Sequence, residues 1–210
     1  MRVAVLSESS ADESAIRIII NSILGIETQA VSLPPLRSRG WPSVIRILPS
    51  VLLHLHYQTN ADALVVVADS DDSPPHQSAH EKIGCEDSQC RLCQLRIAAR
   101  NVLSRLQALP DSGTIRIAIG LAVPAIEAWY RCGVDPHVNE AAWSRHLDGE
   151  HLAYTRRSLK RDVYGTERPS IEIETSFAII ASSRLVNDMS VIERLFPNGF
   201  GALAKDVRSW

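Results

Sequence analysis

The sequence has few aromatic residues, only three lysines and no long apolar run. Aromatic residues make up 5% of its 210 residues, and every basic residue other than Lys82, Lys160 and Lys205 is an arginine. No segment is long and apolar enough to cross a bilayer, and the first apolar stretch is too short for a secretory signal because it meets Glu8. These absences predict a soluble cytoplasmic protein without a membrane partner.

The sequence also lacks a large excess of positive or negative charge. The net charge of −2 argues against a broadly basic surface for nucleic acid, although it leaves room for a local basic site. Hydrophobic residues make up 45% of the chain, enough for a proper core in one domain or one domain with an elaboration. The four cysteines are expected to be reduced thiols or metal ligands, since disulfides are rare in the cytoplasm.

The most informative stretch is the apolar run 63–68, which leads directly into Asp69, Asp71 and Asp72. A short apolar run with β-branched residues is typical of a strand buried on both faces of a parallel sheet. Ligands of such sheets bind beyond the carboxyl ends of the strands. Clustered carboxylates repel one another and prefer a hard cation, so this stretch predicts a site for Mg²⁺ or Mn²⁺.

Two further acidic residues are predicted at the same edge of the sheet. Glu8 follows a strand over residues 2–6, and Glu127 lies in the first turn of a helix that follows a strand over 115–121. The pattern predicts an α/β fold with a parallel sheet flanked by helices. We also expect a strand within 26–33. Four helices should begin near Ala11, after Trp41, near Ser88 and at Pro124, the first with a capping box of Ser10 and Glu13 and the second kinked or broken at Pro49. One or two helices over 175–197 and a last one over 200–207 should complete the chain.

One stretch is concentrated in basic residues. If residues 154–161 form a helix, Arg156, Arg157, Lys160 and Arg161 share a face that either holds phosphates or is simply solvated.

Histidine and cysteine gather between residues 76 and 93. Cys90 and Cys93 have the spacing of zinc ligands, and His80 with Cys85 would complete a closed Cys₃His zinc site, with His76 as the alternative histidine. The other interpretation is a set of small buried thiols beside surface histidines.

Together, Glu8 with the Ser-Ala-Asp-Glu that follows, the Asp69-Ser-Asp71 pair and Ile126-Glu127-Ala-Trp129 resemble the Toprim domain. The similarity is closest to the branch found in overcoming-lysogenization-defect (OLD) nucleases. It implies a core over residues 1–135, with a histidine-cysteine insertion at about 72–93, and a helical extension over 136–210 packed on the core.

The resemblance implies a divalent-metal-dependent nuclease that hydrolyses DNA or RNA. Glu8, Asp69, Asp71 and Glu127 would hold Mg²⁺ or Mn²⁺, and Lys160 would balance charge in the transition state. In this chain Ser9 replaces the glycine that often follows the first acid of the family. OLD nucleases usually carry an ATPase domain, but no Walker A motif occurs here. A separate ATPase partner in phage defence is therefore one expectation. The alternatives are a non-catalytic module that binds nucleic acid or protein, with a structural zinc, and phosphate chemistry on a nucleotide.

Overall fold

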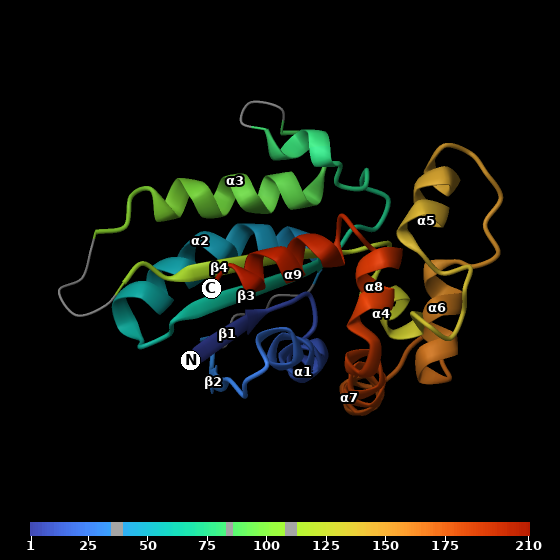
Figure 1. Cartoon of the computed structure of the whole chain (residues 1–210), viewed down its shortest axis with the longest axis horizontal. Helices are drawn as coiled ribbons and strands as arrows, with labels where there is room; N and C mark the ends of the chain where they lie inside the picture. Colours follow the sequence, from blue (N-terminus) through green and yellow to red (C-terminus); the bar gives the residue numbers. More distant parts are fainter. Residues whose placement is uncertain (35–39, 83–85, 108–112) are drawn as a thin grey trace.

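The computed structural model describes residues 1–34, 40–82, 86–107 and 113–210. Its centre is a sheet of four parallel strands in the order β2-β1-β3-β4 (Figure 1). The strands are β1 (Arg2–Leu6), β2 (Gln29–Val31), β3 (Ala63–Asp69) and β4 (Arg116–Ala122). The predicted α/β class and parallel sheet are confirmed. β2 is shorter than the predicted strand within 26–33.

Helices cover both faces of the sheet (Figure 1). One face carries α2 (Trp41–Gln58) and α3 (Arg91–Leu103), and the other carries α1 (Glu13–Leu24) and α9 (Phe200–Arg208). Gly25 ends α1 in the left-handed region at φ 66°, as its position predicts. The expected cap at Ser10 is wrong, because a 3₁₀ turn over Ser10–Asp12 comes first and is capped by the Ser9 hydroxyl.

Two other helices differ from the prediction. α2 continues through Pro49, because its buried stripe (Val44, Leu48, Val51, Leu52 and Leu55) runs on both sides of the proline and burial outweighs one lost hydrogen bond. α3 begins at Arg91 rather than near Ser88, so Cys90 is its N-cap and Cys93 lies in the first turn.

The C-terminal part is helical and gathers at the carboxyl end of the sheet (Figure 1). Its helices are α4 (Ile126–Arg131), α5 (Glu140–Leu147), α6 (Arg156–Tyr164), α7 (Ile171–Leu185) and α8 (Met189–Leu195), with a 3₁₀ turn over Val186–Asp188 between the last two. The sequence predicted that α4 starts at Pro124, and it begins two residues later, at Ile126. α7 packs against α1, and no helix in the described part of the chain is long and apolar enough to cross a membrane.

The edge strand β4 is covered by the segment that leads into α9. The backbone N–H of Ile119 donates to Asp206 Oδ2 at 3.2 Å, and that of Leu121 donates to the Gly199 carbonyl at 3.4 Å. The approach is close enough that a Cβ at Gly199 would lie 2.1 Å from the Leu121 oxygen. Two outward N–H groups of β4 are thus bonded from within the chain, which blunts this edge for pairing with another strand.

Candidate functional site

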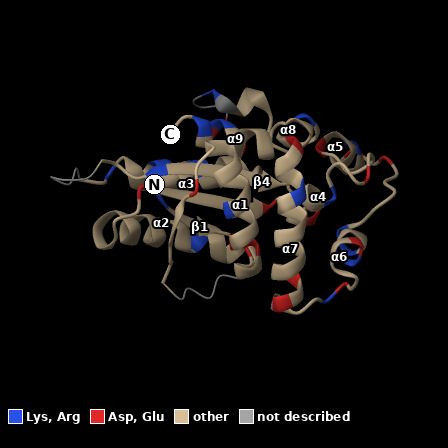
Figure 2. Cartoon of the chain, turned by 60° about the horizontal axis from the view of Figure 1, so that its bottom comes forward, with Lys and Arg blue, Asp and Glu red and all other residues tan. Residues whose placement is uncertain are grey.

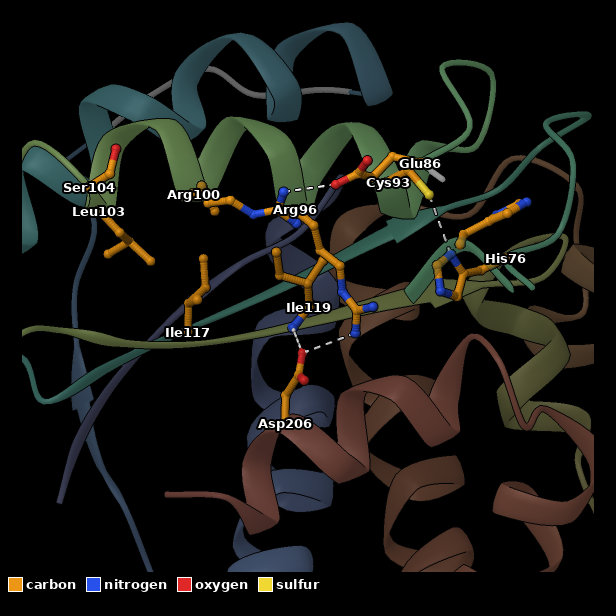
Figure 3. A pocket seen from close by; sticks show the side chains of 12 residues that line it. His76, Glu86, Cys93, Arg96, Arg100, Leu103, Ser104, Ile117, Ile119 and Asp206 are labelled. Carbon is orange, nitrogen blue, oxygen red and sulfur yellow. Dashed lines mark hydrogen bonds and ion pairs between the residues drawn. The ribbon is translucent and has the colours of Figure 1, made fainter. Parts of the chain in front are cut away.

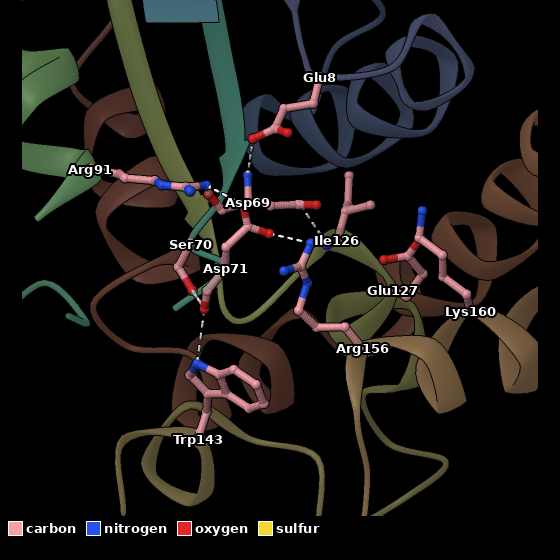
Figure 4. Close-up of polar contacts among 10 residues, drawn as sticks. All are labelled: Glu8, Asp69, Ser70, Asp71, Arg91, Ile126, Glu127, Trp143, Arg156 and Lys160. Atoms are coloured by element: carbon pink, nitrogen blue, oxygen red, sulfur yellow. Dashed lines mark hydrogen bonds and ion pairs between the residues drawn. The ribbon is translucent and has the colours of Figure 1, made fainter. Parts of the chain in front are cut away.

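The acidic residues meet where the strand order of the sheet reverses. The chain passes from β1 to β2 on one side and then crosses to β3 on the other side of β1. Crevices for ligands form at such switch points, beyond the carboxyl ends of the strands. Glu8 follows β1, Asp69 ends β3, and Glu127 lies in α4 after β4 (Figure 4). We call this set of carboxylates, with Asp71, the acidic edge.

Direct hydrogen bonds join the loops at the acidic edge. The backbone N–H of Asp69 donates to Glu8 Oε1 at 3.0 Å, and Asp69 Oδ1 accepts from the backbone N–H of Ile126 at 2.9 Å. The ends of β1 and β3 and the start of α4 are therefore tied together. Burial raises the pKa of Asp69 well above its ordinary value, and the nearby carboxylates of Glu127 and Glu8 raise it further.

Asp71 lies between two arginines. Arg91 donates to its Oδ2 at 2.7 Å, and Arg156 forms an ion pair with its Oδ1 (Figure 4). The Asp71 backbone is in the left-handed region at φ 48°, which aspartate adopts more readily than most residues. Its carbonyl accepts from the indole N–H of Trp143 at 3.2 Å, so α5 also holds this turn.

Arg91 connects the acidic edge to α3. Besides Asp71, its guanidinium donates to the Asp69 carbonyl at 2.8 Å and lies 4.9 Å from the ring centroid of Trp41, at the start of α2. This places a cation between the loop after β3 and the two helices on one face of the sheet. The sequence analysis missed Arg91, although its position directly after Cys90 was a usable signal.

Glu127 and Lys160 face each other at the acidic edge. Glu127 is only 3% exposed, and its Oε1 lies 3.7 Å from Lys160 Nζ. Burial raises the pKa of Glu127, and Lys160 partly offsets that rise. Oε2 of Glu127 is buried and makes no hydrogen bond of good geometry within the described residues. A buried carboxylate oxygen in this state is suited to a cation.

Helix α6 supplies the basic side of the site. The basic stretch, for which the sequence left a helix open, does form one, with a capping box between Thr155 and Ser158. Its Arg156 and Lys160 reach the acidic edge, and Figure 2 shows the basic positions of α6 at this end of the molecule. The neighbouring Arg157 is exposed. Some basic side chains of this stretch therefore form ion pairs at the acidic edge, and others point into solvent.

Asp12 is a buried acid that the sequence analysis did not single out. The hydroxyl of Tyr130 donates to its Oδ1 at 3.0 Å. Burial, together with the Glu127 carboxylate, raises the pKa of Asp12 to about 7. Its position on the same turn after β1 as Glu8 was the available signal. Asp72, the third aspartate of the predicted cluster after β3, is exposed.

The histidine-cysteine group is the second candidate centre. One ligand atom from each of His76, His80, Cys90 and Cys93 lies within 4.8 Å of the others, and this group could bind a metal such as zinc. Both histidines belong to the group, whereas the predicted site had only one histidine, His80 or alternatively His76. The third predicted cysteine, Cys85, lies outside the described residues. Within those residues, no comparable convergence of ligand atoms occurs among the acids of the acidic edge, so a preformed Mg²⁺ site is not seen.

A cavity of about 550 Å³ lies beside this group, between α3, β4 and α9 (Figure 3). Its arginines are engaged in ion pairs, Arg96 with Asp206 at 3.6 Å and Arg100 with Glu86 at 2.8 Å. The cavity walls therefore hold paired charges rather than a ready anion site.

Comparison of the chain with protein-family models, curated proteins and solved structures finds no match.

Proposed function

We propose that the chain is a divalent-cation-dependent phosphodiester hydrolase of the Toprim type that acts on DNA or RNA. The observation that carries the proposal is the placement of Glu8, Asp69 and Glu127 at one edge of the sheet, after β1, at the end of β3 and in the helix after β4. Their pKa values are all raised, chiefly by burial, so the cluster is costly in its ionised form without a cation. Perturbed acids in such a place favour a functional site over a structural one.

The acidic edge offers the carboxylate oxygens that Mg²⁺ and Mn²⁺ prefer as ligands. The buried Oε2 of Glu127, which makes no hydrogen bond of good geometry within the described residues, supports a cation there. When bound, the cation would neutralise the phosphate and lower the pKa of an attacking water. Glu8, Asp69, Asp71 and Glu127 are its proposed ligands.

The basic residues have separate roles in this proposal. Arg91 and Arg156 hold Asp71 in the absence of substrate and transfer part of their pairing to the phosphodiester when it arrives, since arginine suits bidentate phosphate contacts. Lys160 stabilises negative charge that develops in the transition state. In the same proposal, the histidine-cysteine group holds a structural zinc.

Asp69 provides the sharpest test of the proposed activity. Labelled single- and double-stranded DNA and RNA are incubated with Mg²⁺ or Mn²⁺ and with wild type, Asp69→Ala or Asp69→Asn. Asn retains an oxygen acceptor for the Ile126 N–H and so keeps the loop connection, yet it removes the charge. We expect wild-type cleavage to be lost in both variants and retained in Asp162→Asn, whose aspartate is exposed on α6.

Two outcomes would contradict the proposal. Full cleavage by a folded Asp69→Asn would remove the acidic edge from the reaction. Absence of cleavage by wild type on all four substrates would favour the second candidate function, a non-catalytic module that binds nucleic acid or a partner protein. The ion pairs of Asp71 with Arg91 and Arg156 are the observation that favours that candidate, because they already neutralise this acid.

A separate ATPase partner and a role in phage defence remain proposals that follow from the Toprim resemblance. An ATPase that co-purifies with the tagged chain from its native host would support them, and repeated purification without one would count against them.

A further inference from the structure

The histidine-cysteine group and the acidic edge share their connecting residues. Asp71 leads through Pro74 and Pro75 into His76, and Cys90 directly precedes Arg91. We propose that one zinc ion, bound tetrahedrally by His76, His80, Cys90 and Cys93, clamps the loop after β3 to the start of α3 and thereby positions Arg91 against Asp71.

The distances within the group fit a tetrahedral ion. His76 Nδ1 lies 3.6 Å from the sulfur of Cys90 and 3.6 Å from that of Cys93. Zinc bonds of about 2.3 Å to sulfur and about 2.05 Å to nitrogen, at a tetrahedral angle, place the two ligand atoms about 3.6 Å apart. An S–H···N hydrogen bond explains one such contact but not both, because a neutral ring nitrogen has a single lone pair.

The surroundings of the ligands point to a closed site. Cys90, Cys93 and His76 are buried, with exposed fractions of 0%, 1% and 3%. His80 Nδ1 is buried and has no hydrogen-bond partner within the described part of the chain, which is costly unless a ligand binds it. The centroids of the His76 and His80 rings are 5.3 Å apart with the ring planes nearly perpendicular, and one nitrogen of each ring belongs to the group of ligand atoms within 4.8 Å of one another. Four protein ligands leave no open position, which is the pattern of a structural zinc.

The clamp acts on Arg91 through the backbone of α3. Cys90 is the N-cap of α3 and Cys93 lies one turn further, so a bound ion fixes the first turn of the helix. Arg91 projects from that turn to Asp71 Oδ2 and the Asp69 carbonyl. His76 fixes the other end of the same loop. The importance of Arg91 for hydrolysis rests on the proposed function, in which it contacts the phosphodiester, whereas its dependence on zinc does not.

The first experiment identifies the metal and its ligands. We expect about one equivalent of zinc in the purified protein. Replacement by cobalt should give the intense visible bands of a tetrahedral ion and thiolate charge transfer. Cys90→Ser and Cys93→Ser should lose the metal, while Cys132→Ser, which removes a buried thiol after α4, should keep it. Cobalt spectra of wild type do not depend on whether the variants fold.

Several outcomes of this experiment would overturn the ligand set. Wild type that is fully folded and binds neither zinc nor cobalt would refute the site. Loss of the metal in Cys85→Ser, or its full retention in His76→Ala, would refute the assignment of His76 in place of Cys85. A Cys90–Cys93 disulfide in freshly prepared protein would equally exclude it.

The second experiment follows Arg91 directly. In ¹⁵N-labelled protein, the guanidinium signals of Arg91 are assigned by their loss in Arg91→Lys and compared with and without zinc. We expect zinc removal to shift them and speed their exchange with water, and zinc readdition to restore them. Arg208 is the control, because its pair with Glu193 at 2.9 Å lies on the C-terminal helices. Unchanged Arg91 signals in folded, zinc-free protein would refute the clamp. Neither experiment requires cleavage, so their failure is distinct from failure of the proposed hydrolase.

Discussion

Replacing Asp12 by asparagine is expected to change how the stability of the protein depends on pH. Asp12 is buried at the start of α1 and accepts a hydrogen bond from Tyr130. Burial first, and the Glu127 carboxylate second, raise its pKa from 3.8 to about 7. Between these two values the folded chain binds the Asp12 proton more tightly than the unfolded chain does. Stability therefore falls as the pH rises through this window.

The size of the effect follows from the same two values. Each pKa unit corresponds to about 1.4 kcal/mol, so the complete rise corresponds to about 4 kcal/mol. Between about pH 5 and about pH 8, the contribution of Asp12 to the free energy of unfolding falls by about 2 to 3 kcal/mol. Asparagine cannot ionise, yet its carbonyl oxygen still accepts from the Tyr130 hydroxyl. The variant should lack this loss.

Urea unfolding followed by tryptophan fluorescence measures the prediction. Wild type and Asp12→Asn are compared from about pH 5 to about pH 8 without added divalent cations, and we expect the variant to gain about 2 to 3 kcal/mol over wild type across that range. Asp162→Asn, at an exposed position of α6, is the control and should parallel wild type. Parallel curves for Asp12→Asn and wild type would refute the assignment of a raised pKa to this carboxyl.

Two further predictions concern the covering of β4. Gly199→Ala should cost about 1 to 3 kcal/mol, measured as unfolding free energy, because its Cβ would meet the Leu121 oxygen at 2.1 Å; Gly113→Ala, which meets nothing within 4 Å, should not. Glu140→Ala should cost about 1 to 3 kcal/mol by leaving the N–H groups of Asn198 and Gly199 without their acceptor. A much smaller loss in Glu140→Gln would support that cause, and an equal loss would contradict it.

The acidic edge was predictable because it depends on local pattern. Continuous apolar runs mark strands buried on both faces, and the residue that ends each run must lie at the same side of a parallel sheet. Glu8, Asp69 and Glu127 could therefore be assigned to one edge from the sequence alone. The sequence placed Lys160 in a basic stretch, but its role in the transition state came only from the resemblance, and its approach to Glu127 depends on how α6 packs on α4.

Other features depend on contacts between distant segments and left little local signal. Arg91 meets Asp71 only because α3 starts at Arg91 with Cys90 as its N-cap, whereas the sequence predicted a start near Ser88. His76 joins His80 only through the path of the loop between them. Pro49 looked like a break because its cost is local, whereas the burial that overrides it is distributed along the whole of α2.

The contacts of β4 with the final segment bear on how the two halves of the chain depend on each other. Asp206 and Gly199 bond to the free side of the last strand, a side that would otherwise be open to pairing with another strand. A chain shortened to residues 1–135 would keep all four strands and most of the acidic edge. It would also expose β4 as an unpaired edge strand, and we expect the shortened chain to self-associate through strand pairing rather than remain monodisperse. The C-terminal part thus prevents aggregation through the edge of the sheet, and it also supplies Arg156 and Lys160 to the site.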